Sequence, residues 1–231
     1  MNFLEKTKIL IGEEKLNLLS NSKICIFGLG GVGSSVIESL VRAGIGTFYL
    51  YDYDIVEETN LNRQLIATRD NIGKYKIDAT KNRILGINPR AIVLASAIKI
   101  TEKTIDTINF KNFDYIIDAI DDVKAKLLII KKAKEYNVSI ISSMGTANRI
   151  DPFKLKITDI SKTEYCPLAR KIRLELKKDG IYHLDVLNSF EPPRNFINKN
   201  KDLGTISYNV IISGSLMAYH VIKNLTSKSI L

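Results

Sequence analysis

The sequence predicts an α/β fold in which a mostly parallel, Rossmann-like sheet carries helices on both faces and is followed by a C-terminal extension. Two observations favour this class. Short apolar runs alternate with amphipathic stretches through residues 23–144, as in consecutive βαβ units. The first run, KICIFG, also passes directly into a glycine-rich turn and an amphipathic stretch, GLGGVGSSV, as the first strand and helix of such a fold do. Right-handed connections between parallel strands then place helices on both faces.

The individual elements follow from the spacing of apolar residues. Short apolar runs are predicted to be buried strands, and longer stretches with apolar residues three or four positions apart are predicted to be helices. Strands are predicted at 23–28, 47–51, 91–97, 114–120 and 138–144, and helices at 33–43, 74–87 and 123–136, with a short further helix capped by Thr101.

Beyond residue 150 the alternation becomes looser. Two strand-like segments, FKLKITDI and IYHLDVLN, flank a helix predicted at 167–178, and the closing ISYNVIISGSLMAYHVIKNL is predicted to be a strand or turn that runs into an apolar helix. The polar segment 189–204 has two prolines and little periodicity, which predicts a loop. Since there is no internal repeat or clear linker, we expect one domain over 1–231. It would comprise a nucleotide-binding half at 1–150 and a C-terminal part at 151–231, in which loop 189–204 binds substrate.

The composition of the chain limits the class of protein and the cellular compartment that we expect. The chain has 231 residues, 45% hydrophobic and 26% charged, which is ordinary for a soluble globular protein. Two cysteines, Cys25 and Cys166, are too few for a disulfide framework or a four-cysteine zinc site. The N-terminus mixes charges into its apolar residues, and no stretch reaches the roughly 18 to 20 apolar residues that span a bilayer. We therefore expect a cytoplasmic protein with no membrane partner.

The net charge suggests a polyanionic partner. It is +9, with a pI near 9.4, and a basic surface attracts nucleic acids through its long-range field and the release of counterions. The alternative is that lysines are spread evenly over the surface, in which case the charge needs no partner.

The glycine-rich turn predicts a nucleotide site. Gly28, Gly30 and Gly33 fit the pattern G-x-G-x-x-G after a strand and at the start of a helix, where backbone can approach phosphate closely. Asp52 ends the next predicted strand, where a carboxylate can accept the hydroxyl groups of a ribose. On these features alone, an NAD-dependent oxidoreductase is the leading interpretation.

The stretch that follows changes the predicted ligand. DYDIVEETNLNRQ at 52–64 places Asn60, Arg63 and Gln64 together, and Lys76 comes shortly afterwards. The forked donors of Arg63 and the point charge of Lys76 suit a triphosphate, which has more charge to neutralise than a pyrophosphate. The strand DYIIDAIDD then ends in three acids, one of which could hold Mg²⁺ against phosphate oxygens: Asp118, Asp121 and Asp122.

These motifs in this order resemble the adenylylating family that includes the ubiquitin-activating enzymes. The resemblance spans roughly residues 20–145 and implies that Asp52 holds the ribose of ATP, with Gln64 as a supporting polar residue. It further implies that Asp121 is the acid on the Mg²⁺ side. The nucleotide-binding set that it implies is Gly28, Gly30, Gly31, Gly33, Asp52, Asn60, Arg63, Gln64, Lys76 and Asp121, of which Arg63, Lys76 and Asp121 are catalytic.

The C-terminal half resembles one branch of this family. The chain lacks the CxxC pairs that other bacterial members use for zinc, and SSMGTANRIDPFKLKITDISKTEYCPLARKIRLELKKDGI resembles the tRNA threonylcarbamoyladenosine dehydratases. The resemblance implies that ATP with Mg²⁺ activates the carboxylate of N6-threonylcarbamoyladenosine at position 37 of tRNA as an acyl-adenylate. A tethered nitrogen then closes a ring and AMP leaves. It also implies a homodimer without zinc, and it leaves room for a monovalent cation and a sulfur-relay partner.

Several residues beyond the nucleotide motifs are candidates for function. The cations expected to contact tRNA are Arg170, Lys171, Arg173 and Arg194. Cys166 precedes Pro167 at a helix start, where a thiol could act as a nucleophile, although a small capping residue is the preferred interpretation. Family members often carry an N-terminal arginine that reaches the partner's ATP site, and here Lys6 and Lys8 stand in that stretch.

Three alternative functions stay open at this point. The first is an adenylyltransferase that activates the C-terminal glycine of a sulfur-carrier or ubiquitin-like protein, which would share the ATP site. The second is the NAD-dependent oxidoreductase, and the third is a non-catalytic scaffold that retains the fold.

Overall fold

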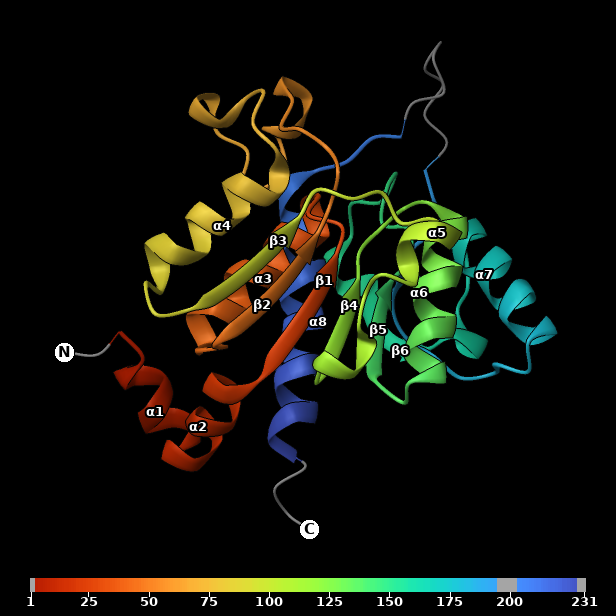
Figure 1. Ribbon diagram of the computed structural model, residues 1–231. Helices are drawn as coiled ribbons and strands as arrows, with labels where there is room; N and C mark the ends of the chain where they lie inside the picture. The colour runs from red at the N-terminus through yellow and green to blue at the C-terminus, as the bar shows by residue number, and fades with distance from the viewer. Residues whose placement is uncertain (1–2, 195–202, 228–231) are drawn as a thin grey trace.

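The computed structural model describes residues 3–194 and 203–227, which form one seven-stranded sheet covered by helices (Figure 1). The strand order is β3-β2-β1-β4-β5-β7-β6, and all neighbours are parallel except β6 and β7. The predicted α/β class with a mostly parallel sheet is therefore confirmed. The strands are β1 (Lys23–Phe27), β2 (Thr47–Tyr51), β3 (Ile92–Ser96), β4 (Tyr115–Asp118), β5 (Ser139–Ser143), β6 (Leu155–Asp159) and β7 (Asp185–Ser189).

Helices pack on both faces of this sheet. On one face, α3 and α8 cover the side chains of β1 and β4, with α2 and α4 at the margin. On the other face, α5, α6 and α7 pack against the alternate residues of the same strands. The helices are α1 (Glu5–Ile11), α2 (Glu13–Asn21), α3 (Gly31–Ala43), α4 (Lys76–Ile87), α5 (Glu102–Ile105), α6 (Val123–Glu135), α7 (Pro167–Lys178) and α8 (Ser207–Ser227).

Short 3-10 helices complete the connections, and the C-terminal strands extend the main sheet. β7 pairs with β5 in parallel and with β6 in antiparallel orientation, so the part after residue 150 adds two strands to the same sheet. The 3-10 helices are η1 (Glu58–Asn60), η2 (Arg69–Asn71), η3 (Phe110–Asn112), η4 (Pro152–Lys154) and η5 (Ile160–Lys162).

Most predicted elements lie within a few residues of the observed ones, and two differ in kind. The closing segment, predicted to begin as a strand or turn, is helical from Ser207 onward, because its apolar side packs along α3 and the sheet. Of the strand-like IYHLDVLN, only its second half lies in a strand, since β7 begins at Asp185. Of the predicted loop 189–204, Ser189 ends β7, residues 190–194 and 203–204 have no regular structure, and 195–202 lie outside the described residues.

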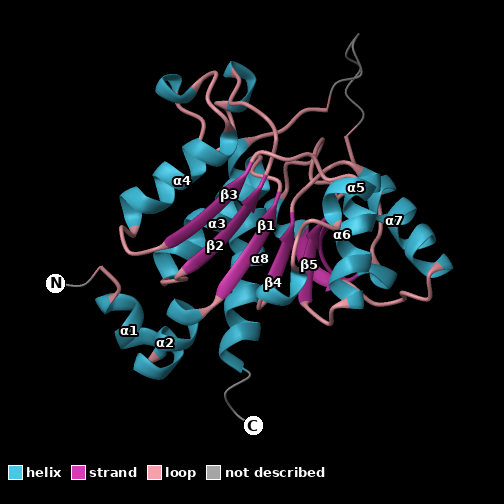
Figure 2. Cartoon of the chain, viewed as in Figure 1, coloured by secondary structure: helices cyan, strands magenta, loops and turns pink. Residues whose placement is uncertain are grey.

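The parallel arrangement brings the carboxyl ends of β1, β2 and β4 to one edge of the sheet. Gly28 follows β1, Asp52 follows β2, and Asp118 is the last residue of β4. In Figure 2 the loops after these strands gather at the same edge. A ligand of an open parallel sheet binds at this edge, so the fold positions the residues singled out in the sequence around one place. Among residues 3–194 and 203–227, no helix is long and apolar enough to cross a membrane.

Candidate nucleotide-binding site

The turn after β1 can be built only with glycine at two positions. Gly28 has φ +88° and donates its N–H to the carbonyl oxygen of Tyr51 at 2.9 Å, while a methyl group on it would lie 2.7 Å from the carbonyl oxygen of Ala119. A methyl group on Gly33 would overlap the carbonyl oxygen of Gly28. The backbone therefore turns sharply from β1 into α3, and the first N–H groups of the helix are available to an anionic ligand.

Asp52 ties the end of β2 to this turn. Its carboxylate accepts hydrogen bonds from the N–H groups of Leu29 at 2.6 Å and Asp54 at 2.8 Å, and the residue is 9% exposed. Burial raises the pKa of Asp52 above its ordinary value, although the two N–H groups and the charge of Lys76 act in the opposite direction. The carboxylate is thus fixed in place beside the glycine turn, with its charge only partly compensated.

The loop after β2 folds back over the start of α3. Asn60 is buried and completes a capping box with Glu57, whose N–H it accepts at 3.2 Å. Arg63 donates from Nη1 to the carbonyl oxygen of Thr59 and to Oδ1 of Asn62, both at 2.8 Å. The side chain of Asn60 therefore shapes the loop, and Arg63 is oriented by neutral acceptors within it.

Gln64 lies beside the glycine turn with an unused acceptor. A methyl group on Gly30 would stand 4.0 Å from Nε2 of Gln64, and the residue is 5% exposed. Within the described part of the chain, Oε1 of Gln64 is buried and has no hydrogen-bond partner. A buried polar atom without a partner is costly, so this amide oxygen is suited to receive a donor from a bound ligand.

Lys76 begins α4 and points back toward the end of β2. Its Nζ donates to Oδ2 of Asp54 at 2.7 Å, and its side chain is 8% exposed whereas that of Asp54 is 47% exposed. The cation is therefore held near Asp52 by an acid that is itself half in solvent.

The three acids after β4 have different surroundings. Asp118 is fully buried in an ion pair with Lys126 at 2.7 Å and also accepts from the Ser142 hydroxyl, so it is no open metal ligand. Asp122 is the N-cap of α6. Asp121 is exposed and has neither a hydrogen-bond nor an ion-pair partner among the residues described.

Lys126 is a feature that the sequence analysis missed. Its ammonium group donates to Asp118 at 2.7 Å, to Oγ of Ser142 at 3.0 Å and to the carbonyl oxygen of Ser143 at 3.0 Å, which uses all three of its donors. These contacts join the ends of β4 and β5. Lys126 lies four residues before Ile130 on the buried face of α6, and this spacing is the one signal of its burial that the sequence carries.

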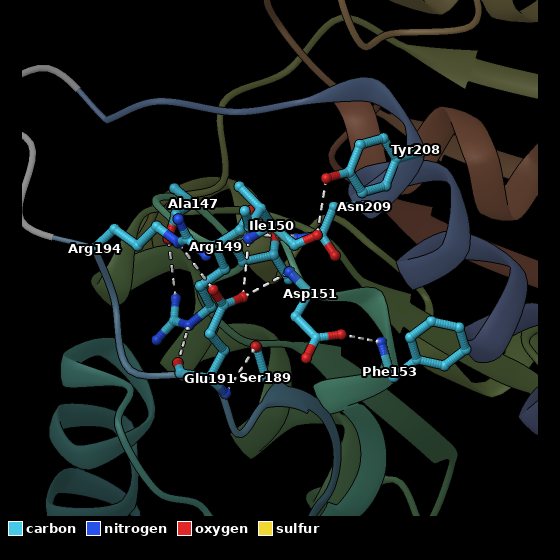
Figure 3. A network of polar contacts seen from close by, with 11 residues as sticks. Ala147, Arg149, Ile150, Asp151, Phe153, Ser189, Glu191, Arg194, Tyr208 and Asn209 are labelled. Atoms are coloured by element: carbon cyan, nitrogen blue, oxygen red, sulfur yellow. Dashed lines mark hydrogen bonds and ion pairs between the residues drawn. The ribbon is translucent and has the colours of Figure 1, made fainter.

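A second missed residue, Arg149, organises the C-terminal half (Figure 3). It is 4% exposed, and its guanidinium donates to four main-chain carbonyl oxygens. Burial lowers the pKa of Arg149, while Cys166 and Glu191 nearby oppose this effect. The carbonyl oxygens belong to Gly145, Ala147, Tyr165 and Glu191, at 2.6 to 3.1 Å.

The carboxylate of Glu191 holds the neighbouring loop. It accepts from the N–H groups of Ile150 and Asp151, both at 2.8 Å, and pairs with Arg194 at 3.3 Å. Burial acts to raise the pKa of Glu191, but these donors outweigh it and hold the pKa below its ordinary value. The Arg149 and Glu191 contacts together fix the loop after β5 against the segment that follows β7.

Cys166 is the N-cap of α7, as the sequence predicts. Its Sγ accepts from the N–H of Ala169 at 3.4 Å and from the N–H of Gly145 at 3.3 Å, and the residue is 6% exposed. The other cysteine, Cys25, lies fully buried in β1, where burial raises the pKa of its thiol.

The cations predicted to contact tRNA fall into two groups. Arg170 and Lys171 are exposed on α7. Arg173 donates to the carbonyl oxygens of Ile160 and Thr163 and to the Thr163 hydroxyl, so its guanidinium stabilises the turn before α7. The side chain of Arg194 is 48% exposed and is partly engaged by Glu191.

Comparison with known proteins decides the family. A family model described as "ThiF family" matches residues 5–230. The chain belongs to the ThiF family. This match confirms the resemblance to the adenylylating family that the nucleotide-binding motifs of the sequence indicate.

Individual ThiF-family relatives are similar over most of their length. The tRNA threonylcarbamoyladenosine dehydratase of Bacillus subtilis is 41% identical over 189 residues, which cover 81% of this chain and 74% of the relative. A crystal structure of Escherichia coli tRNA N6-threonylcarbamoyladenosine dehydratase, TcdA, in complex with AMP superposes with a TM-score of 0.91 at 33% identity. It covers 97% of this chain and 94% of that one. The same enzyme in complex with ATP gives a TM-score of 0.88 at 32% identity, over 97% and 93% of the two chains.

Proposed function

We propose that this protein is an ATP-dependent tRNA threonylcarbamoyladenosine dehydratase. The free carboxylate of the threonylcarbamoyl group on the adenosine at position 37 attacks the α-phosphorus of ATP, which forms an acyl-adenylate and releases pyrophosphate. A nitrogen of the same group then attacks the activated carbonyl, which closes a ring and releases AMP. The observation that carries this proposal is the superposition of nearly the whole chain on TcdA structures that contain AMP or ATP. The single sheet shared by both halves supports treating 1–231 as one adenylylating domain.

The residues at the sheet edge suit ATP. In this proposal the tight turn at Gly28 and Gly33 presents backbone N–H groups to phosphate, and Asp52 accepts the ribose hydroxyl groups; the fixed position of Asp52 beside the turn supports this role. A bound ATP supplies a hydrogen-bond donor to the buried Oε1 of Gln64, which has no partner among the described residues. Gly30 and Gly31 line the same turn, whereas Asn60 contributes by holding the loop that carries the cations.

Two cations and one acid supply the electrostatics of adenylation. Arg63 and Lys76 stabilise negative charge that develops around the α-phosphorus, and preorganised donors of this kind are often the largest contribution to such a rate. Asp121, exposed at the carboxyl edge of β4, fits Mg²⁺, which prefers carboxylate and phosphate oxygens. The Mg²⁺ that accompanies ATP neutralises phosphate charge when bound.

The ring closure needs no enzyme thiol. The nucleophilic nitrogen is tethered to the carbonyl that it attacks, so its effective concentration is high. In this proposal Cys166 caps α7, as its two N–H contacts indicate, and does not form a thioester. A requirement for a monovalent cation and an interaction with a sulfur-relay protein stay predictions to which no residue is assigned.

The substrate surface and the assembly follow from exposed residues. Arg170 and Lys171 on α7, with Arg194, provide the positive charge for tRNA phosphates, which are the main source of affinity in such complexes. We also propose a homodimer that works in the cytoplasm. It would bury exposed apolar side chains of α1 and of the edge strand β3, namely Ile9, Leu10, Ile92 and Leu94.

One assay tests the proposal against its alternatives. The purified protein is incubated with ATP and either threonylcarbamoyl-modified tRNA, unmodified tRNA, or a sulfur-carrier protein, and AMP and the cyclised nucleoside are quantified. We expect AMP and cyclised product with modified tRNA alone. AMP formation with the carrier protein alone would establish the adenylyltransferase alternative, and binding of NADH without affinity for ATP would establish the oxidoreductase.

Site variants locate the chemistry. Arg63→Ala and Asp121→Ala should each lower the rate of AMP release by about 10²-fold to 10³-fold, the range for loss of one preorganised group at a transition state. Arg69→Ala is the matched control, because Arg69 lies in the same loop region and its side chain is 80% exposed. Full activity of Arg63→Ala and Asp121→Ala would overturn the site assignment.

A further inference from the structure

Asn148 holds two distant points of the chain at once. Its N–H donates to the carbonyl oxygen of Gly204 at 2.8 Å, and its Oδ1 accepts the N–H of Gly204 at 2.7 Å. Its carbonyl oxygen accepts the N–H of Arg194 at 2.8 Å. Asn148 has φ +57°, a left-handed conformation that asparagine tolerates better than most residues. One residue thus fixes the positions of both Arg194 and Gly204.

Two further hydrogen bonds connect the segment at Gly204 to the proposed nucleotide site. The carbonyl oxygen of Thr205, next to Gly204, accepts Nδ2 of Asn62 at 3.3 Å. Oδ1 of Asn62 in turn accepts Nη1 of Arg63 at 2.8 Å. Hydrogen bonds therefore link the proposed phosphate cation Arg63 through Asn62 to Thr205, and the adjoining residue Gly204 is hydrogen-bonded to Asn148.

The residues that follow Asn148 are held by several hydrogen bonds, which Figure 3 shows around Arg149 and Ile150. The next residue, Arg149, is buried among carbonyl oxygens, and its own carbonyl oxygen accepts Nδ2 of Asn209 at 3.2 Å. The carbonyl oxygen of Ile150 accepts the hydroxyl of Tyr208 at 2.8 Å. Because α8 and the sheet hold the loop after β5 in this way, a displacement of the segment at Gly204 is resisted mainly at Asn148.

We propose that Asn148 is a positioning residue that couples the tRNA contact at Arg194 to the geometry of Arg63 at the ATP phosphates. This inference rests on the proposed function. A polyanionic tRNA that engages Arg194 restrains this residue, and the existing hydrogen bonds of Asn148 extend the restraint to Gly204 and Thr205, which hold Asn62 against Arg63. Coupling between two binding sites is reciprocal, so modified tRNA tightens the binding of ATP and ATP tightens the binding of tRNA by the same factor.

The test measures this factor directly. The Kd of a non-hydrolysable ATP analogue is determined with and without saturating threonylcarbamoyl-modified tRNA for the wild-type protein and four variants. For the wild type we expect tRNA to lower the Kd by at least about 5-fold, the lower end of typical coupling between sites. In Asn148→Gly the left-handed backbone is preserved and only the side-chain acceptor is lost, and the factor should fall below about 2.

Three variants separate positioning from a general structural effect. Asn148→Asp keeps an acceptor for Gly204 and should restore most of the coupling. Asn62→Ala breaks the series at its other end and should lose the coupling as Asn148→Gly does, which keeps the test decisive if Asn148→Gly folds poorly. Asn137→Gly is the matched control, because Asn137 also has a positive φ, of +56°, but lies in the turn between α6 and β5.

The outcomes distinguish this inference from the function on which it rests. If the wild-type protein releases no AMP with modified tRNA, the proposed function fails and this inference fails with it. If AMP is released but tRNA leaves the Kd of the ATP analogue unchanged, only the coupling is refuted. Coupling at the wild-type level in both Asn148→Gly and Asn62→Ala would also refute it.

Discussion

The buried ion pair beneath the proposed ATP site can be broken from one side by Lys126→Met. The side chains of Lys126 and Asp118 are both fully buried and 2.7 Å apart. Methionine fills nearly the same volume, but it leaves the Asp118 carboxylate without its cation and the carbonyl oxygen of Ser143 without a donor. Removing one partner of such a pair costs about 3 to 5 kcal/mol of the free energy of unfolding, because a buried charge is left uncompensated. A domain typically has about 5 to 15 kcal/mol in total.

Chemical and thermal denaturation followed by circular dichroism measure this loss. For a chain of this size each kcal/mol shifts the Tm by about 2 to 4 °C, so Lys126→Met should lower the Tm by roughly 6 to 20 °C. The control is Lys124→Met on the exposed face of α6, which should change the free energy of unfolding by less than about 0.5 kcal/mol.

A double variant tests the cause of the loss. Adding Asp118→Asn to Lys126→Met removes the uncompensated charge and keeps an acceptor for the N–H of Ile120. The new amide group can donate to the Ser142 hydroxyl oxygen, which has lost its donor Lys126. The double variant should therefore recover at least half of the lost stability. The reasoning is refuted if Lys126→Met stays within about 1 kcal/mol of the wild type, or if the double variant is less stable than the single one.

Three further outcomes rest on single contacts. Because the pKa of Glu191 is lowered, its ionised form stabilises the fold at neutral pH, and this contribution is lost as pH falls through the lowered pKa. Glu191→Gln should thus lower the denaturation midpoint at pH 7, and its deficit should shrink below about pH 4. Gly33→Ala should abolish binding of an ATP analogue in calorimetry, because the new methyl group overlaps the carbonyl oxygen of Gly28, whereas Gly86→Ala meets nothing within 4 Å and should bind normally. Cys25, which is fully buried, should react with a thiol reagent only in denaturant, and labelling of Cys25 in the native protein would contradict its burial.

The sequence was most informative where one local pattern decides the structure. The strand at 23–28 and the glycines after it were predictable, because the turn at Gly28 and the close approach at Gly33 exclude any side chain. The capping role of Cys166 before Pro167 was likewise readable, since an N-cap needs only an acceptor in front of a helix. These predictions depend on neighbours within a few positions.

Two buried cations whose partners are brought to them only by the fold were not predicted from the sequence. Arg149 donates to the carbonyl oxygens of Tyr165 and Glu191. Because every residue has a main-chain carbonyl group, the residue type does not show which of them accepts such a bond. In the sequence Lys126 is one of several cations of a lysine-sided helix, because its partner Asp118 becomes a neighbour only when β4 and α6 pack. Both are buried charges, which composition and periodicity assign to the surface by default.

The strengths of the contacts around Lys76 explain how the proposed site can be both ordered and available. Asp54 holds the buried Lys76 ammonium at 2.7 Å, but the side chain of Asp54 is itself 47% exposed, so water can solvate this carboxylate when another anion takes its place. A phosphate can therefore replace Asp54 at little cost, whereas Asp52, held by the N–H groups of Leu29 and Asp54, is fixed where it is. The residue predicted to bind the ribose, Asp52, is therefore held firmly by main-chain N–H groups. The cation predicted to bind the phosphates, Lys76, has a partner that can be displaced. The charge of the nucleotide is thus met by a cation that is already in place and whose present partner is easily displaced.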